Sequence, residues 1–174
     1  MEIRQEKRTG QALIEFVLLI PLFMLVIANV VNFGGMFYAA ITVANAARHG
    51  SQHFIYGSAT VKNSGTPDAD SVWLLVQNDT ATLPNLASRV IRVCLENRND
   101  VNSPSCQTRG SGSATFTSPP LDTRAEGGAF LNGWVDVGYT YTPYIPLFTV
   151  PIVNVALTPP PQMMVRQSLM RVLN

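Results

Sequence analysis

The sequence is poor in charged residues. Only 13% of its 174 residues are Asp, Glu, Lys or Arg, whereas about a quarter is usual in a soluble domain. The deficit is concentrated in one place, because no charged residue occurs between Glu15 and Arg48. The net charge is +1 and the basic residues are scattered, so no basic patch indicates nucleic acid as a partner.

Cysteine and histidine are also scarce, with two of each. A structural zinc site takes four such ligands, and no histidine lies near Cys94 or Cys106, so no metal or other cofactor is expected. His49 and His53 have the i, i+4 spacing of helical metal ligands, but no third ligand is nearby. We interpret them as surface or packing residues. The sequence also lacks a Ser-His-Asp set and a nucleotide-binding loop, and we predict no enzymatic activity.

Cys94 and Cys106 allow two interpretations. In an oxidising compartment they would form one disulfide, closing a polar, turn-prone loop and stabilising the fold by about 2–4 kcal/mol. In a reducing compartment they would be two unpaired thiols. The choice depends on which side of a membrane this part of the chain occupies.

The N-terminus predicts a membrane helix. A short leader with three basic residues precedes an apolar run at residues 11–31. At about 1.5 Å per residue, this run can cross a hydrocarbon core of about 30 Å, and it is longer than the apolar region of a secretory signal peptide. Basic residues before the run place the N-terminus in the cytoplasm and the rest of the chain outside.

Glu15 is unusual because a carboxylate near the start of a membrane helix is costly wherever it faces lipid. One interpretation places Glu15 at the level of the lipid headgroups, where the cost is small. The other gives a function to its position, five residues after Gly10.

Residues 10–16, GQALIEF, resemble the processing site of type IV pilin-like proteins. In those proteins a basic leader ends in Gly, and the mature chain begins with four mostly apolar residues followed by Glu. More narrowly, the pattern resembles the TadE-like pseudopilin family of tight-adherence (Flp) pilus systems. It is formed here by Arg8, Gly10, Ala12, Glu15 and Phe16.

The resemblance implies that a prepilin peptidase cuts after Gly10, so that Gln11 begins the mature chain. It also implies a role in subunit assembly for Glu15 and Phe16, with the Glu15 carboxylate pairing with the amino terminus of a neighbouring subunit. Gln11 is less apolar than the residue usual in major pilins, and Phe16 replaces the Tyr common in Flp pilins. Both features, and the length of the chain, fit the TadE-like group.

The implied partners are the membrane, the prepilin peptidase, other pilin or pseudopilin subunits and the pilus assembly platform. The implied location is the bacterial inner membrane, crossed once, with the C-terminal domain extracytoplasmic and associated with the pilus.

Beyond the membrane run, small residues at helical spacing extend the helix to about residue 47. Gly34 and Gly35 within it indicate either a kink that interrupts the helix or a close approach between helices. Pro143, Pro146 and Pro151 argue against a second membrane helix. The pattern predicts a short helix at 68–78, capped by Asp68 or Asp70, and strands at 89–95, 128–141, 152–157 and 163–173.

The predicted fold class is therefore α+β, a long N-terminal transmembrane helix followed by a small antiparallel β-sheet domain, as in pilins. The expected divisions are a cytoplasmic leader at 1–10, the membrane and pilin-like helix at 11–48, and an extracytoplasmic α+β domain at 49–174. The functional hypothesis is a minor pilin or pseudopilin of a tight-adherence pilus that supports surface adhesion. The alternatives are an uncleaved, signal-anchored extracytoplasmic binding module and an anchored extracytoplasmic enzyme.

Overall fold

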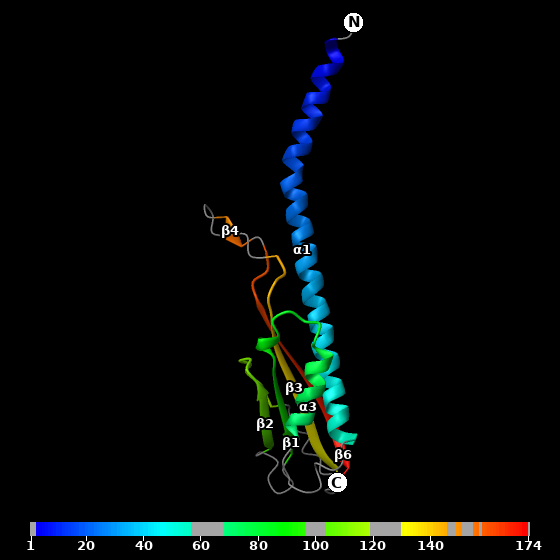
Figure 1. Ribbon diagram of the computed structural model, residues 1–174, viewed down its shortest axis with the longest axis vertical. Coiled ribbons are helices and arrows are strands. Elements are labelled where there is room, and N and C mark those ends of the chain that lie inside the picture. Colours follow the sequence, from blue (N-terminus) through cyan, green and yellow to red (C-terminus); the bar gives the residue numbers. More distant parts are fainter. Residues whose placement is uncertain are drawn as a thin grey trace. The chain divides into compact units, whose positions relative to one another are not determined.

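The computed structural model describes residues 3–56, 68–96, 104–118, 130–145, 149–150, 155–156 and 158–173. Its architecture is α+β, as the sequence predicted: a long helix is followed by a shorter helix and an antiparallel sheet (Figure 1). The elements are α1 Ile3–Tyr56, α3 Ala69–Asp79, the 3₁₀ turn η1 Leu86–Ser88, β1 Val90–Leu95, β2 Ser105–Gly110, β3 Phe130–Tyr141, β4 Thr149–Val150, β5 Val155–Ala156 and β6 Gln162–Leu173.

The chain forms two compact units. The first contains Met1–Phe37 and Pro143–Pro160, and so combines the first part of α1 with the two-stranded β4–β5 sheet. The second contains Tyr38–Thr142 and Pro161–Asn174, and so combines the last part of α1 with α3 and the four-stranded sheet.

Helix α1 is continuous from Ile3 to Tyr56. It runs through Pro21, which lacks a backbone N–H and therefore removes one helical hydrogen bond. The helix is not interrupted at Gly34 and Gly35, and an added Cβ at Gly34 would meet no atom within 4 Å. The two adjacent glycines, Gly34 and Gly35, cost a helix only about 2 kcal/mol relative to alanine, which the surrounding good helix formers can absorb.

Helix α3 begins where the sequence predicted, with Asp68 as its N-cap. The Asp68 Oδ1 atom accepts hydrogen bonds from the backbone N–H groups of Asp70 at 3.1 Å and Ser71 at 3.3 Å. These groups have no partner inside the helix, so the cap satisfies them. At the other end, the Thr80 hydroxyl donates to the Val76 carbonyl at 2.6 Å.

The four-stranded sheet is fully antiparallel, in the order β2-β1-β3-β6. Strands β1, β3 and β6 confirm the predicted strands at 89–95, 128–141 and 163–173. Strand β2 was not predicted, because its sequence SCQTRG has no run of alternating apolar residues. Of the predicted strand at 152–157, Val155–Ala156 forms β5 and the other residues lie outside the described ones.

One face of this sheet packs against the two helices, and the core of the second unit lies between them. A Cβ added at Gly50 of α1 would lie 3.2 Å from Val72 of α3 and 3.3 Å from Val135 of β3. The three elements therefore meet at Gly50, which allows the close approach. The buried apolar side chains of this core include Val43, Ala46, Ala47, Phe54, Val72, Val76, Ile91, Val93, Val135 and Val137.

The opposite face of the sheet, which we call the outer face, is also buried in its centre. Trp134 and Asp136 of β3 alternate with the valines of the helix-covered face, yet both are at most 1% exposed. The chain after β2 covers part of this face, because a Cβ added at Gly138 would lie 2.7 Å from Ala114 and 3.5 Å from Phe116. The second unit is therefore a three-layer structure at this point.

Candidate assembly segment

The predicted processing site, between Gly10 and Gln11, lies within α1 and is exposed. An added Cβ at Gly10 would meet no atom within 4 Å, so packing does not require glycine here. Glycine weakens a helix interior by about 1 kcal/mol relative to alanine, because it loses more conformational freedom on folding. The peptide bond after Gly10 is thus accessible, at a point where the helix is intrinsically weak.

Glu15 lies one helical turn after Gln11, and the two side chains interact. The Gln11 Nε2 atom donates a hydrogen bond to Glu15 Oε1 at 3.1 Å, the i, i+4 geometry expected on a helix surface. Phe16 follows, with 61% of its side chain exposed. The structure therefore places Gly10, Gln11, Glu15 and Phe16 within two turns of one helix, with the carboxylate directed toward the position of Gln11.

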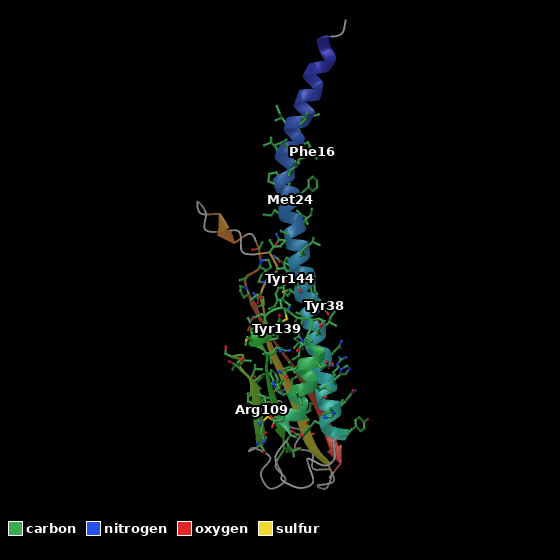
Figure 2. The ribbon with its side chains drawn as sticks, in the orientation of Figure 1. Phe16, Met24, Tyr38, Arg109, Tyr139 and Tyr144 are labelled. Atoms are coloured by element: carbon green, nitrogen blue, oxygen red, sulfur yellow. A yellow bond between two sulfur atoms is a disulfide. The ribbon has the colours of Figure 1, made fainter. Side chains whose placement is uncertain are left out.

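From Leu13 to Phe37 the helix exposes apolar side chains all around its axis. Phe16 and Met24 project away from it in Figure 2, and they belong to a larger exposed set. The set comprises Leu13, Ile14, Phe16, Val17, Leu18, Leu19, Ile20, Leu22, Phe23, Met24, Val26, Ile27, Val30, Val31, Phe33 and Phe37. A helix that is apolar on every side requires an apolar environment, either a lipid bilayer or other helices.

Length and composition agree with this requirement. In the part of the chain that the structure describes, one helix is long and apolar enough to cross a membrane, and it covers Gly10–Phe54. Most of its exposed apolar side chains lie in its first half, but Phe37 and Ile41 in its second half are also exposed; the second half in addition buries residues such as Ala39 and Val43.

Asn29 lies within the apolar run and Asn32 directly follows it, and both have hydrogen-bond partners. Asn29 Nδ2 donates to the Leu25 carbonyl one turn earlier at 2.9 Å. Asn32 is fully buried and makes two hydrogen bonds to the backbone of Ile145: its Nδ2 donates to the carbonyl at 3.1 Å, and its Oδ1 accepts from the N–H at 3.0 Å. Sequence reasoning missed Asn32, because its partner is 113 positions away.

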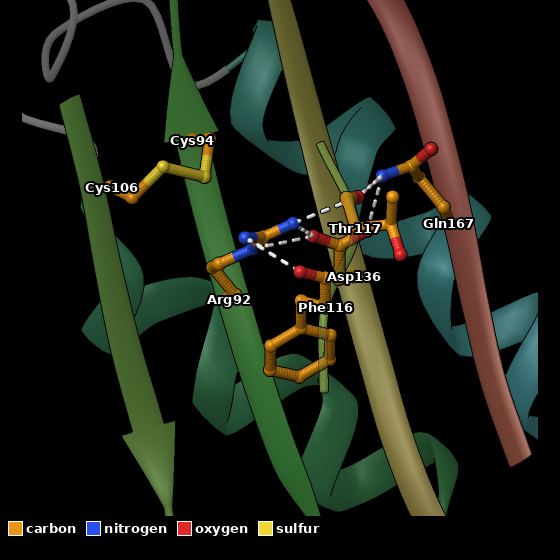
Figure 3. Close-up of polar contacts among 7 residues, drawn as sticks. All are labelled: Arg92, Cys94, Cys106, Phe116, Thr117, Asp136 and Gln167. Atoms are coloured by element: carbon orange, nitrogen blue, oxygen red, sulfur yellow. Dashed lines mark hydrogen bonds and ion pairs between the residues drawn. A yellow bond between two sulfur atoms is a disulfide. The ribbon is translucent and has the colours of Figure 1, made fainter. Parts of the chain in front are cut away.

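The outer face of the sheet contains a buried ion pair (Figure 3). Arg92 Nε donates to Asp136 Oδ2 at 2.8 Å, and Gln167 Nε2 donates to Asp136 Oδ1 at 2.7 Å. The Arg92 guanidinium also donates to the backbone carbonyls of Phe116 and Thr117 at 3.4 and 3.0 Å. The Asp136 carboxylate thereby joins three strands, and the Arg92 guanidinium joins them to the chain after β2.

Burial raises the pKa of the Asp136 carboxyl above its usual value of 3.8, and the hydrogen bonds from Arg92 and Gln167 oppose that rise. The Asp136 side chain is 1% exposed and that of Arg92 is 15% exposed. The Asp136 carboxylate is thus largely removed from water, and its charged form is stabilised by the hydrogen bonds from Arg92 and Gln167. The arrangement joins strands and leaves the carboxylate covered, which suits a structural role.

A disulfide joins Cys94 of β1 to Cys106 of β2. The two residues are directly opposite each other in the register of the two strands. The bond therefore ties the edge strand β2 to the centre of the sheet. Neither cysteine is free.

His49 and His53 lie among the described residues of α1. Among the described residues, no group of three His, Cys, Asp or Glu side chains is arranged to hold a metal ion. His49 Nδ1 lies 2.9 Å from Asp79 Oδ2, so this pair links α1 to α3 within the second unit.

Comparison with known proteins bears on the N-terminal segment. Searches of curated proteins and of solved structures found no match. A family model described as TadE-like protein matches residues 10–52. The matched range begins at the predicted processing glycine, Gly10, and extends over nearly all the remainder of α1. The resemblance predicted from residues 8–16 is thus confirmed, and over residues 10–52 this chain is TadE-like in sequence.

Proposed function

We propose that the chain is a minor pilin or pseudopilin that takes part in assembling a tight-adherence pilus and thereby supports surface adhesion. The observation that carries the proposal is a TadE-like segment that coincides with an exposed, apolar helix starting at Gly10. The chain would act in assembly and would catalyse no reaction.

Processing is proposed to occur between Gly10 and Gln11. Exposure of this peptide bond and the low helix propensity of glycine both favour local unwinding into a peptidase cleft. Removal of the leader, residues 1–10, would take away Arg4, Lys7 and Arg8. The remaining helix would then begin with a single charged group, its new amino terminus, close to Glu15.

Glu15 is proposed to pair with the amino terminus of a neighbouring subunit. Its carboxylate lies one turn from Gln11 and is exposed, so it can meet a partner positioned beside that turn. In an apolar helix bundle, two such charges would each be costly alone and would compensate each other when paired. The pairing would set the axial register of adjacent helices, with Phe16 packing beside it.

The second unit is proposed to lie outside the cytoplasm, where it would contact partner subunits. The disulfide between Cys94 and Cys106 supports this topology, because disulfides persist in oxidising compartments and are rare in the cytosol. The positive leader on the other side of the apolar run agrees with the same orientation.

Intact-mass measurement of the protein from its native membrane tests the processing step. With the prepilin peptidase present, we expect a chain that begins at Gln11; without it, we expect the leader to be retained. The variant Gly10→Leu should block cleavage, whereas Gly34→Leu, at a second glycine of α1 with open space around it, should be cleaved normally. Retention of the leader with the peptidase present would leave an uncleaved, membrane-anchored binding module.

The role of Glu15 is tested by Glu15→Gln, which keeps the shape of the side chain and removes its charge. We expect normal cleavage but a loss of co-purification with pilin subunits after cross-linking in the membrane. Removing one partner of a desolvated pair costs about 3–5 kcal/mol, or at least a hundredfold in association. Wild-type levels of cross-linked complex would refute this role.

A further inference from the structure

Asn32 connects α1 to a distant part of the chain inside the first unit. Its amide makes a pair of hydrogen bonds with the backbone N–H and carbonyl of Ile145, at 3.0 and 3.1 Å. The side chain is 0% exposed, so these bonds are protected from water. The segment that follows β3 is therefore held against one defined position of the helix.

That position coincides with the expected outer boundary of the membrane. Asn32 follows Gln11 by 21 positions, which corresponds to about 32 Å along a helix axis. The hydrocarbon core of a bilayer is about 30 Å thick. If α1 crosses the bilayer from Gln11, Asn32 lies where the helix emerges on the far side.

The segment tied to Asn32 has the composition of an interfacial element. No Asp, Glu, Lys or Arg occurs between Asp136 and Arg166. Tyr144, next to the tied residue, is 51% exposed, and tyrosine is enriched where hydrocarbon meets water. The same stretch contains six prolines, which lack backbone N–H donors and so reduce the number of polar groups that need partners. They are Pro143, Pro146, Pro151, Pro159, Pro160 and Pro161.

We propose that the Tyr144–Ile145 segment and the β4–β5 pair rest on the outer headgroup region of the bilayer that α1 crosses, as a second membrane contact of the chain. The occupant of this surface is lipid. The inference rests on the membrane insertion of α1 in the proposed function, and adds to it a contact that the family match at residues 10–52 does not cover.

The headgroup region suits this element better than either neighbouring environment. Strands β4 and β5 pair through only two residues each, and an isolated two-stranded hairpin is marginally stable in water. In the hydrocarbon core its unpaired backbone edges would be costly, because no water is present to satisfy them. At the interface, the backbone groups of these short strands keep contact with water.

Depth-dependent quenching in vesicles tests this placement. The full chain is reconstituted in two sets of phosphatidylcholine–phosphatidylglycerol vesicles, with a lipid nitroxide near the headgroup end of the acyl chain, which reports on positions 144 and 74, or near its methyl end, which reports on position 23. The two native cysteines are bonded to each other, so a single added cysteine carries the fluorescent label. The test variant is Tyr144→Cys. Phe23→Cys within the apolar run is the positive control, and Leu74→Cys on α3, 67% exposed, is the control for an exposed site of the second unit.

We expect the label at position 144 to be quenched at least twofold more strongly than the label at position 74. Equal, weak quenching at positions 144 and 74, together with strong quenching at position 23, would overturn this inference and leave the membrane anchor intact. Weak quenching at all three positions would overturn the anchor and the inference together. In an Asn32→Ala background, quenching at position 144 should fall toward the level at position 74; unchanged quenching would overturn the role given to Asn32.

Discussion

The buried ion pair on the outer face of the sheet makes a quantitative prediction for Arg92→Met. Methionine retains much of the apolar length of the side chain but removes the donors to Asp136, Phe116 and Thr117. The Asp136 carboxylate, 1% exposed, would keep the hydrogen bond from Gln167 and lose its counter-charge. The variant should therefore unfold more easily.

The size of the effect follows from burial. Removing one partner of a buried pair costs about 3–5 kcal/mol. Arg92 is 15% exposed and Gln167 remains in place, so the lower end, about 3 kcal/mol at pH 7, is expected. This is a large part of the 5–15 kcal/mol that stabilises a typical domain.

The deficit should depend on pH. Burial raises the pKa of the folded Asp136 carboxyl above 3.8, so the folded state binds this proton more tightly than the unfolded state. The stability that protonation of Asp136 contributes is fully present below about pH 4 and is lost as the pH rises through the pKa of the folded state. Without Arg92, the charged form of folded Asp136 is less favoured still, so the carboxyl takes up its proton at a higher pH than in the wild type. Once Asp136 is neutral it no longer needs a counter-charge, so the stability deficit of Arg92→Met relative to the wild type should shrink as the pH is lowered from 7 toward 4.

The assay is denaturant unfolding of the full chain in detergent micelles, followed by near-ultraviolet circular dichroism, to which the buried Trp134 contributes. The matched control is Arg109→Met, which breaks the exposed pair with Asp70 and should change stability far less. Equal losses for the two variants, or a deficit for Arg92→Met that grows as the pH falls, would refute the reasoning.

Three further perturbations have defined outcomes in the same unfolding assay. Gly50→Leu should lower stability by about 1–3 kcal/mol, because its first added carbon already lies 3.2 Å from Val72. The double variant Cys94→Ala/Cys106→Ser should lose about 2–4 kcal/mol, because the unfolded chain is no longer cross-linked. Asp68→Ala should lose about 1 kcal/mol, because two N–H groups of the first turn of α3 lose their acceptor.

Each of these predictions has its own control. Gly34→Leu, in open space, should leave stability unchanged or raised, so an equal loss at Gly34 would contradict the packing argument for Gly50. Reductant should lower the stability of the wild type to that of the double cysteine variant and leave that variant unaffected. Asp68→Asn should retain most of the cap, and a loss equal to that of Asp68→Ala would point to charge instead of capping.

The elements that sequence reasoning predicted are those whose signals are local. The membrane-type helix follows from an uninterrupted apolar run, and α3 follows from the capping aspartate before a short apolar stretch. The positions of Gly10 and Glu15 on one helix also follow from their spacing. Their roles in cleavage and assembly remain predictions that the mass and cross-linking experiments address.

Strand β2 shows what local signals miss. Its residues are mostly polar, so no alternation marks it as a strand. It is a strand because β1 offers backbone partners along its whole length and because the disulfide holds Cys106 opposite Cys94. An edge strand needs one paired neighbour and no apolar pattern of its own.

The sequence by itself determined the fold class, the apolar helix with its TadE-like opening, and most strands, because helix and strand periodicity depend on neighbouring residues. Only the tertiary structure decided which polar residues meet. Arg92 and Asp136 are 44 positions apart, and Asn32 and Ile145 are 113 apart. Such pairs depend on strand register and on where the chain returns to the helix, and no local pattern encodes a contact made across that distance.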